Sequence, residues 1–132
     1  MSHHRETVNA DGAPAAVGPY VHAVRAGGLI FCSGQIALDP ATGELVGADS
    51  VEEQAERALE NLKIVCAAAG ASLGDAVRMT VYLTDIEDFA KVNEVYARAF
   101  EGGEPPARTA YAVAALPKGA KVEIDAIVAV PD

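Results

Sequence analysis

The stretch VRMTVYLTDIEDFAKVNEVYARAF (Val77–Phe100) changes its hydrophobic period part of the way along. Apolar and polar residues alternate as far as Thr84, and this period of two predicts a β-strand with two different faces. Over Ile86–Phe100 the apolar residues recur at the three- and four-residue spacing of a helix, which Gly102-Gly103 ends. A strand that leads directly into an amphipathic helix predicts a layer of helix packed on a layer of sheet.

The chain before this unit predicts a hairpin and another helix. Two β-rich runs, Val21–Ala26 and Leu29–Ile36, are joined by a pair of glycines, which is typical of a tight β-hairpin. The segment SVEEQAERALENLKIVCAAAG (Ser50–Gly70) has apolar residues at helical spacing, with a capping box at its start and a glycine at its end. Two strands and a helix are therefore expected ahead of Val77.

The chain after Phe100 adds two more strands, at about Thr109–Leu116 and Lys121–Val130. The complete order is ββαβαββ, and right-handed crossovers then place both helices on one face of a single mixed sheet. This is an α/β architecture of the α+β kind, and a chain of 132 residues has the length of one domain, 1–132. We expect residues 1–12 to form a loose segment at its start.

The uncovered face of this sheet is expected to be partly apolar. Leu29 and Phe31 alternate with Ile30, so the second strand is apolar on both sides, and Ile127 falls on the same side of the last strand as Glu123. Apolar residues on an uncovered sheet face usually pack against another subunit. We therefore expect a homo-oligomer.

Composition and charge argue against several classes of function. With 51% hydrophobic residues, 22% charged residues and no apolar run long enough to span a bilayer, the chain is typical of a globular protein and no membrane partner is expected. A net charge of −9 with scattered basic residues argues against nucleic acid as a partner. The N-terminal segment lacks the apolar core of a secretory signal and two cysteines make no disulfide framework, which favours a cytoplasmic protein.

No motif in the sequence points to a metal or a cofactor. Gly-rich phosphate loops, CxxC pairs and HExxH motifs do not occur. His3 and His4 are adjacent, but a metal site needs further ligands in fixed geometry, so a solvated terminus is the simpler interpretation. We expect no metal and no cofactor, and the role of the two histidines stays open.

Arg108 lies within PPARTAY (Pro105–Tyr111), at the entrance of a predicted strand. Its nearest acidic residues in the sequence, Glu101 and Glu104, precede two prolines that stiffen the approach. A planar fork of donors held at such a place suits a carboxylate ligand. A solvated surface arginine and an ion pair between subunits are the alternatives, and the spacing does not decide among them.

Glu123 alternates with apolar residues in KVEIDAIV (Lys121–Val128), so it is either a solvated carboxylate or a group in a cleft that a neighbouring subunit covers. Other cleft candidates are Tyr20 as an aromatic wall, and Ser33 and Gly34 as a hydroxyl with adjacent backbone donors. In the second predicted helix, Phe89 is a core residue by default because of its helical spacing, and Asn93 could face a cleft or solvent. Taken singly, each of these residues is a weak indication.

Five segments carry a more specific signal, in collinear order from about Ala13 to Val130. They are APAAVGPY (Ala13–Tyr20), CSGQIALDPATGELV (Cys32–Val46), ALENLKIVCAAAGASLGDAVRMTVYLTDIEDFAKVNEVY (Ala58–Tyr96), PPAR (Pro105–Arg108) and ALPKGAKVEIDAI (Ala115–Ile127). Together they resemble the reactive intermediate deaminase family, also called the Rid or YjgF family. Because the resemblance covers nearly the whole chain, it is more specific than any single motif in it.

The resemblance implies a chorismate-mutase-like fold assembled as a homotrimer with three clefts between subunits. Enzymes of this family hydrolyse enamines and imines of the 2-iminobutanoate and 2-iminopropanoate type to 2-keto acids and ammonia. The resemblance implies that Arg108 grips the substrate carboxylate and that Glu123 activates water as a general base. It further implies that the cleft is lined by Tyr20, Ser33, Gly34, Phe89, Asn93 and the backbone of Ala110.

The chain departs from the family at Ala110, where many members carry a cysteine. Backbone contacts survive this change, so deamination is still expected, whereas any chemistry of a cleft thiol is in doubt. Cys32 and Cys66 are expected in the core, as small hydrophobes. Two alternatives stay open, a trimer that binds keto acids or small carboxylates as a regulator and a structural trimer with a relict cleft, and the preferred imino acid and pathway are not specified.

Overall fold

The structure, a computed structural model, describes residues 4–132, and within this range one mixed sheet of six strands carries two α-helices. The strands are β1 (Glu6–Val8), β2 (Ala23–Ala26), β3 (Leu29–Gln35), β4 (Ala76–Leu83), β5 (Ala107–Ala112) and β6 (Val122–Ala129). The helices are α1 (Val51–Ala68) and α2 (Phe89–Ala99), with short 3₁₀ helices η1 (Leu73–Asp75), η2 (Ile86–Asp88) and η3 (Pro117–Gly119). The strand order is β1-β2-β3-β6-β4-β5, in which only the β4–β5 pair is parallel.

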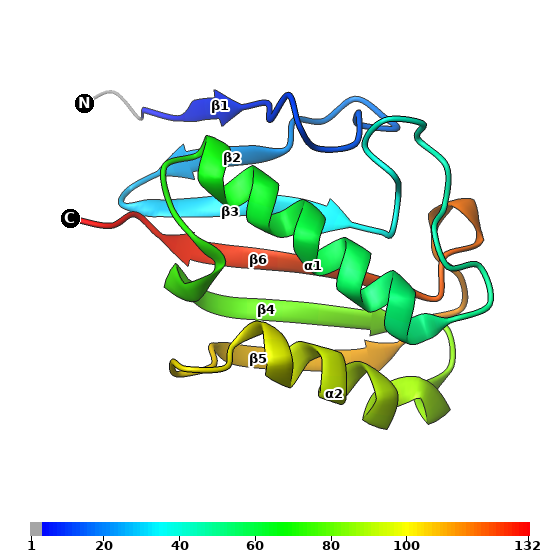
Figure 1. Ribbon diagram of the computed structural model, residues 1–132. Helices are drawn as coiled ribbons and strands as arrows, with labels where there is room; N and C mark the ends of the chain where they lie inside the picture. The colour runs from blue at the N-terminus through cyan, green and yellow to red at the C-terminus, as the bar shows by residue number, and fades with distance from the viewer. Residues whose placement is uncertain (1–3) are drawn as a thin grey trace.

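Both α-helices lie on the same face of the sheet, which confirms the predicted two-layer α+β architecture (Figure 1). The β2–β3 hairpin is also confirmed, because Ala26 pairs with Leu29 across Gly27 and Gly28, whose φ angles are 58° and 83°. Two consecutive residues with positive φ make the turn type that matches the twist of a hairpin, and glycine adopts it without strain.

The first strand was not expected from the sequence. Glu6–Val8 pair with β2, from Glu6 opposite Arg25 to Val8 opposite Ala23, so the expectation of a loose segment over residues 1–12 is wrong for this part. Three residues are too few to show a period of two, and their pairing with the edge of the hairpin is a long-range effect. His3 lies outside the described residues, and His4 is exposed with its Nε2 3.6 Å from Glu6 Oε1.

Two element boundaries differ from the prediction for local reasons. The second helix begins at Phe89 and not at Ile86, because Asp85 accepts a hydrogen bond from the Glu87 N–H and closes a separate 3₁₀ turn first. The fifth strand covers Ala107–Ala112 in place of Thr109–Leu116, since it pairs in parallel with β4 and ends where β4 ends.

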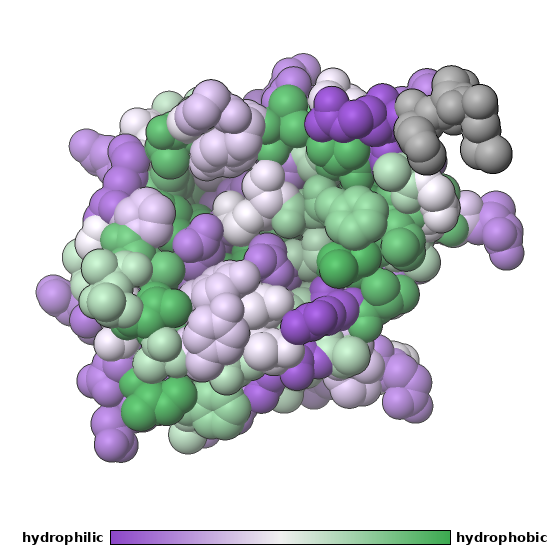
Figure 2. Space-filling view, turned by 180° about the vertical axis from the view of Figure 1, so that it is seen from behind, coloured by the Kyte–Doolittle hydropathy of each residue, from purple (hydrophilic) through white to green (hydrophobic). Residues whose placement is uncertain are grey.

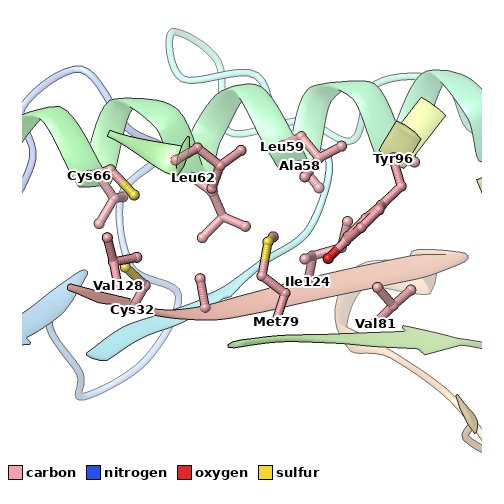
Figure 3. Packing of buried hydrophobic residues seen from close by; sticks show 14 of the residues in the cluster. Cys32, Ala58, Leu59, Leu62, Cys66, Met79, Val81, Tyr96, Ile124 and Val128 are labelled. Atoms are coloured by element: carbon pink, nitrogen blue, oxygen red, sulfur yellow. The ribbon is translucent and has the colours of Figure 1, made fainter. Parts of the chain in front are cut away.

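The core lies between the helices and the sheet (Figure 3). Leu59 and Leu62 of α1 face Met79 and Ile124 of β4 and β6, and these side chains are almost completely buried. Ser50 caps α1 by accepting from the Glu53 N–H at 3.1 Å, whereas the Ser50 N–H donates to the Gly47 carbonyl, so only one of the two bonds of the predicted capping box is present. None of the helices in residues 4–132 is both long enough and apolar enough to cross a membrane.

The opposite face of the sheet is not covered by any element of residues 4–132, and it carries apolar side chains between polar ones (Figure 2). Phe31, Val77 and Tyr111 are between 43% and 47% exposed. Tyr82 packs edge-on against Tyr111, with 5.4 Å between ring centroids, and donates a hydrogen bond to Asp125 at 2.8 Å. We call this surface the bare face.

Candidate functional site

Arg108 lies on β5 opposite Met79 of β4, and this register directs its side chain to the helix-covered face. There the Nη1 atom donates to Oδ1 of Asn93 at 2.7 Å, and the guanidinium carbon lies 5.2 Å from the ring centroid of Phe89 and 4.9 Å from that of Tyr96. Two aromatic faces and an amide therefore hold a permanent cation in one orientation.

The positive charge of Arg108 forms no ion pair with any carboxylate of residues 4–132. A hollow of about 440 Å³ opens beside it, lined by Asn93, Tyr96, Ala97, Phe100, Pro105, Pro106 and Arg108. Ala110, two residues further along β5, shares the helix-covered face and packs on the core. We call Phe89, Asn93, Arg108 and Ala110 the arginine half-site, and these four predicted residues lie together.

Glu123 lies on β6 opposite Tyr82 of β4, with its side chain on the bare face. Its carboxylate covers Gly34, where a Cβ atom would lie only 2.9 Å from Glu123 Cδ, so only glycine leaves room for this side chain. Tyr20, Gly34 and Glu123 line one small hollow, together with residues that include His22 and Pro14. We call Tyr20, Gly34 and Glu123 the glutamate half-site.

Ser33 is next to this half-site, and its hydroxyl and its N–H are both bonded to backbone carbonyls. Its Oγ donates to the carbonyl of Val21 at 2.6 Å, and its N–H donates to the carbonyl of His22 at 2.9 Å. Both bonds attach β3 to the chain that follows Tyr20. Ser33 therefore supports the position of Tyr20 in the single chain.

Burial raises the pKa of the Glu123 carboxyl, and the nearby charge of Asp125 raises it further. Asp125 lies two residues along β6 on the same face and accepts the hydrogen bond from Tyr82. Burial and this bond raise the pKa of Tyr82 to about 12. Asp125 was not among the residues predicted for the site, although its spacing of two from Glu123 could have identified it.

The two half-sites lie on opposite faces of the same sheet. On β4 the partner of Arg108 is Met79 and the partner of Glu123 is Tyr82, and these positions differ by an odd number, so they face opposite ways. Within a single chain Glu123 therefore does not lie beside Arg108. The alternation pattern showed that each residue is on a strand but not how the strands align.

Cys32 and Cys66 face each other in the core between β3 and α1 (Figure 3), as expected. Burial and a hydrogen bond to the Cys66 thiol raise the pKa of Cys32, the bond being the larger effect. Within residues 4–132, no three His, Cys, Asp or Glu side chains are placed to hold a metal ion.

Comparison with known proteins identifies the family. Residues 10–130 match the model of the family described as endoribonuclease L-PSP. The chain is 57% identical over 125 residues to protein DfrA of Myxococcus xanthus, covering 93% of this chain and 94% of that one. It is 49% identical over 123 residues to the 2-iminobutanoate/2-iminopropanoate deaminase of Mus musculus, covering 93% of this chain and 90% of that one.

Among solved structures, the crystal structure of Escherichia coli TdcF with bound serine matches with a TM-score of 0.89 and 44% identity, over 94% of this chain and 98% of that chain. The fold is thus shared with a protein whose crystal structure contains bound serine. The chain belongs to the reactive intermediate deaminase (Rid/YjgF) family, as its sequence segments predicted.

Proposed function

We propose that the protein is an imine deaminase that hydrolyses 2-imino acids, and the enamines in equilibrium with them, to 2-keto acids and ammonia. The observation that carries this proposal is the guanidinium of Arg108, which two aromatic rings and Asn93 orient beside an open hollow while no carboxylate of residues 4–132 neutralises it. The deaminase from mouse and the serine-bound TdcF are relatives that support this substrate class.

The proposed active unit is a homotrimer in which the arginine half-site of one subunit meets the glutamate half-site of its neighbour. Opposite faces of one sheet cannot approach the same small molecule, so a shared cleft requires two chains. The exposed apolar side chains of the bare face, such as Phe31 and Tyr111, suit burial against a second copy. A trimer closes this head-to-tail contact into a ring and leaves no unpaired half-site.

The chemistry of this cleft follows from the two charges. Arg108 would bind the substrate carboxylate through the guanidinium N–H groups that Asn93 does not occupy. Glu123 would remove a proton from water as the water oxygen attacks C2 of the imine, and would return that proton to the nitrogen. Loss of ammonia from the resulting carbinolamine gives the 2-keto acid. General base catalysis of this kind contributes about 10²–10⁴-fold.

Mixing two inactive variants tests the shared cleft directly. Arg108→Ala and Glu123→Gln chains are each inactive alone, but in a trimer refolded from an equal mixture some clefts receive an intact half from both neighbours. Half of the arginine halves and half of the glutamate halves are intact, so about one quarter of wild-type activity returns. A mixture that stays inactive would mean that both groups act from one chain, and the shared-cleft model would be wrong.

A regulatory trimer that binds keto acids without turnover is the competing function. The elevated pKa of Glu123 favours the enzyme, because a half-buried carboxyl with a raised pKa is a stronger base than a solvated one. A dehydratase-coupled assay that follows 2-imino acid decay with and without the protein decides between them. Decay at the uncatalysed rate, together with saturable binding of 2-oxobutanoate, would establish the regulator.

The proposed compartment is the cytoplasm, where pyridoxal-phosphate enzymes would supply the imines. The two cysteines, Cys32 and Cys66, are free thiols in the structure, and this suits a reducing environment. The net charge of −9 supports a small-molecule substrate over a phosphate backbone.

A further inference from the structure

His22 is a buried histidine that the proposed chemistry leaves unassigned. Only 5% of its surface is exposed, and both ring nitrogens are bonded to the backbone of the N-terminal segment. The Ala10 N–H donates to Nδ1 at 2.9 Å, and Nε2 lies 2.8 Å from the carbonyl oxygen of Pro14. Because Nδ1 accepts, the ring is neutral with its proton on Nε2, and it donates that proton to Pro14.

The two bonds of the His22 ring hold the segment from Ala10 to Pro14 against the start of β2. Ala10 and Pro14 are held at the two sides of the ring, and the Ala13 N–H closes a turn on the Ala10 carbonyl at 3.1 Å. Figure 1 shows this segment between β1 and β2, crossing to the end of the sheet where β3 finishes. The imidazole therefore fixes where the loop after Pro14 starts.

The end of the same loop is fixed by the backbone around His22 itself. The His22 carbonyl accepts from the Ser33 N–H, and the preceding Val21 carbonyl accepts from Ser33 Oγ. Tyr20 lies two residues before His22, and the loop lines one hollow with Gly34 and Glu123. One residue thus ties both ends of the loop that faces the glutamate half-site.

We propose that His22 is a positioning residue that holds the loop of residues 14–20, and through it Tyr20, against Glu123. This inference rests on the proposed function, because that function defines the step, water activation at Glu123, that His22 supports. It predicts that loss of the two bonds impairs water activation at Glu123 and leaves carboxylate binding at Arg108 intact, because the arginine half-site lies on the other face of the sheet.

Two variants of similar size separate the bonds of His22 from its bulk. His22→Leu fills the space without a donor or acceptor, whereas His22→Gln supplies one of each at the end of the side chain. We express kcat per active site, with the number of sites measured by 2-oxobutanoate binding. We expect His22→Leu to lower this kcat by a factor of about 10 to 100 and to change the Kd for 2-oxobutanoate less than about twofold. His22→Gln should restore kcat to within about threefold of wild type.

Val65→Ala is the matched control, because Val65 is fully buried in α1 and belongs to neither half-site. It should lower stability and leave kcat per site unchanged. Three outcomes would overturn the positioning role. His22→Leu could keep the wild-type kcat, it could lose total activity only in proportion to a loss of binding sites, or His22→Gln could fail to recover kcat.

Amide hydrogen exchange keeps the inference testable if the protein proves to have no deaminase activity. Exchange at Ala10, whose N–H donates to the imidazole, should be faster in His22→Leu than in wild type, and unchanged in His22→Gln and Val65→Ala. Faster exchange without any wild-type turnover would disprove the proposed function alone. Unchanged exchange at Ala10 in His22→Leu would disprove the tie itself.

Discussion

The arginine half-site and the glutamate half-site are built in different ways. The first is formed by side chains of two regular elements, since α2 presents Phe89 and Asn93 to Arg108 on β5. The second combines two strand residues, Gly34 and Glu123, with one loop residue, Tyr20, whose segment is held by contacts such as those of His22. Anchoring a carboxylate requires a rigid fork, which regular elements supply, whereas a loop can close over a water that must exchange.

The largest expected effect is in the arginine half-site. Arg108→Ala removes the carboxylate anchor, and loss of a desolvated charge pair costs about 2–5 kcal/mol of transition-state binding. Arg108→Lys should recover little, because a point charge makes neither the paired bonds nor the contacts with both rings. Steady-state kcat/KM measures both variants, with Arg98→Ala on the exposed surface of α2 as the control. Wild-type kcat/KM in Arg108→Ala would show that the substrate is anchored elsewhere.

In the glutamate half-site the effect is expected on kcat and not on binding. Glu123→Gln keeps the shape that fits over Gly34 but removes the base, so kcat should fall by about 10²-fold or more. Calorimetric titration with 2-oxobutanoate should give a Kd close to wild type, since Arg108 is unchanged. Glu52→Gln, on the exposed first turn of α1, is the matched control. If affinity and turnover fall together in Glu123→Gln, the two half-sites do not divide binding from catalysis.

A smaller effect is expected from the charge next to Glu123. The base works only when it is deprotonated, so a raised pKa places the acid limb of the kcat profile at higher pH than an ordinary glutamate would give. Asp125→Asn removes a negative charge that favours protonation of Glu123, and it keeps an oxygen that can accept from Tyr82. The acid limb should therefore move to lower pH in this variant. A limb that stays in place or moves to higher pH would show that Asp125 does not act on the base.

The contrast between the half-sites also explains how far the sequence could predict the structure. Periodicity identified both helices and the strand that carries Glu123, because each of these elements is long enough to show its period. The strand that carries Arg108 was predicted to start just after this residue, at Thr109, whereas the structure has it at Ala107–Ala112. The strand order, which places β6 between β3 and β4, depends on pairing between distant segments. That order and register decide which faces the two charges occupy, so the opposite placement of the half-sites was not predictable from alternation alone.

The N-terminal segment next to the glutamate half-site was harder to predict for the same reason. β1 has three residues and His22 follows a single apolar residue, so no local pattern distinguishes them. β1 is placed by its pairing with β2, and His22 is placed by hydrogen bonds across 12 and 8 residues, so both depend on segments without a shared period. Family resemblance named Tyr20 and Gly34 as cleft residues, but it gave no reason for their positions.

The smallest expected effect on turnover concerns the thiols, which belong to neither half-site. Cys32 lies on β3 next to Ser33, but it faces the core, where it meets Cys66 under α1 (Figure 3). Both sulfurs are buried, so neither is open to attack by an electrophile in the folded protein. Ala110 leaves the arginine half-site without the thiol that many family members have there. A Cys32→Ser, Cys66→Ala double variant should therefore keep wild-type kcat/KM.

Stability should decrease in that double variant, because it places a hydroxyl in an apolar site and opens a small cavity above it. The serine alone costs about 1–3 kcal/mol if its hydroxyl stays unpaired, and urea unfolding at a fixed protein concentration measures the loss. Iodoacetamide should not inactivate the native protein, since neither buried sulfur is accessible to it. Rapid inactivation that 2-oxobutanoate prevents would place a thiol in the cleft. It would then follow that β3 presents Cys32, and not Ser33 and Gly34, to the bare face, and the glutamate half-site described above would be incorrect.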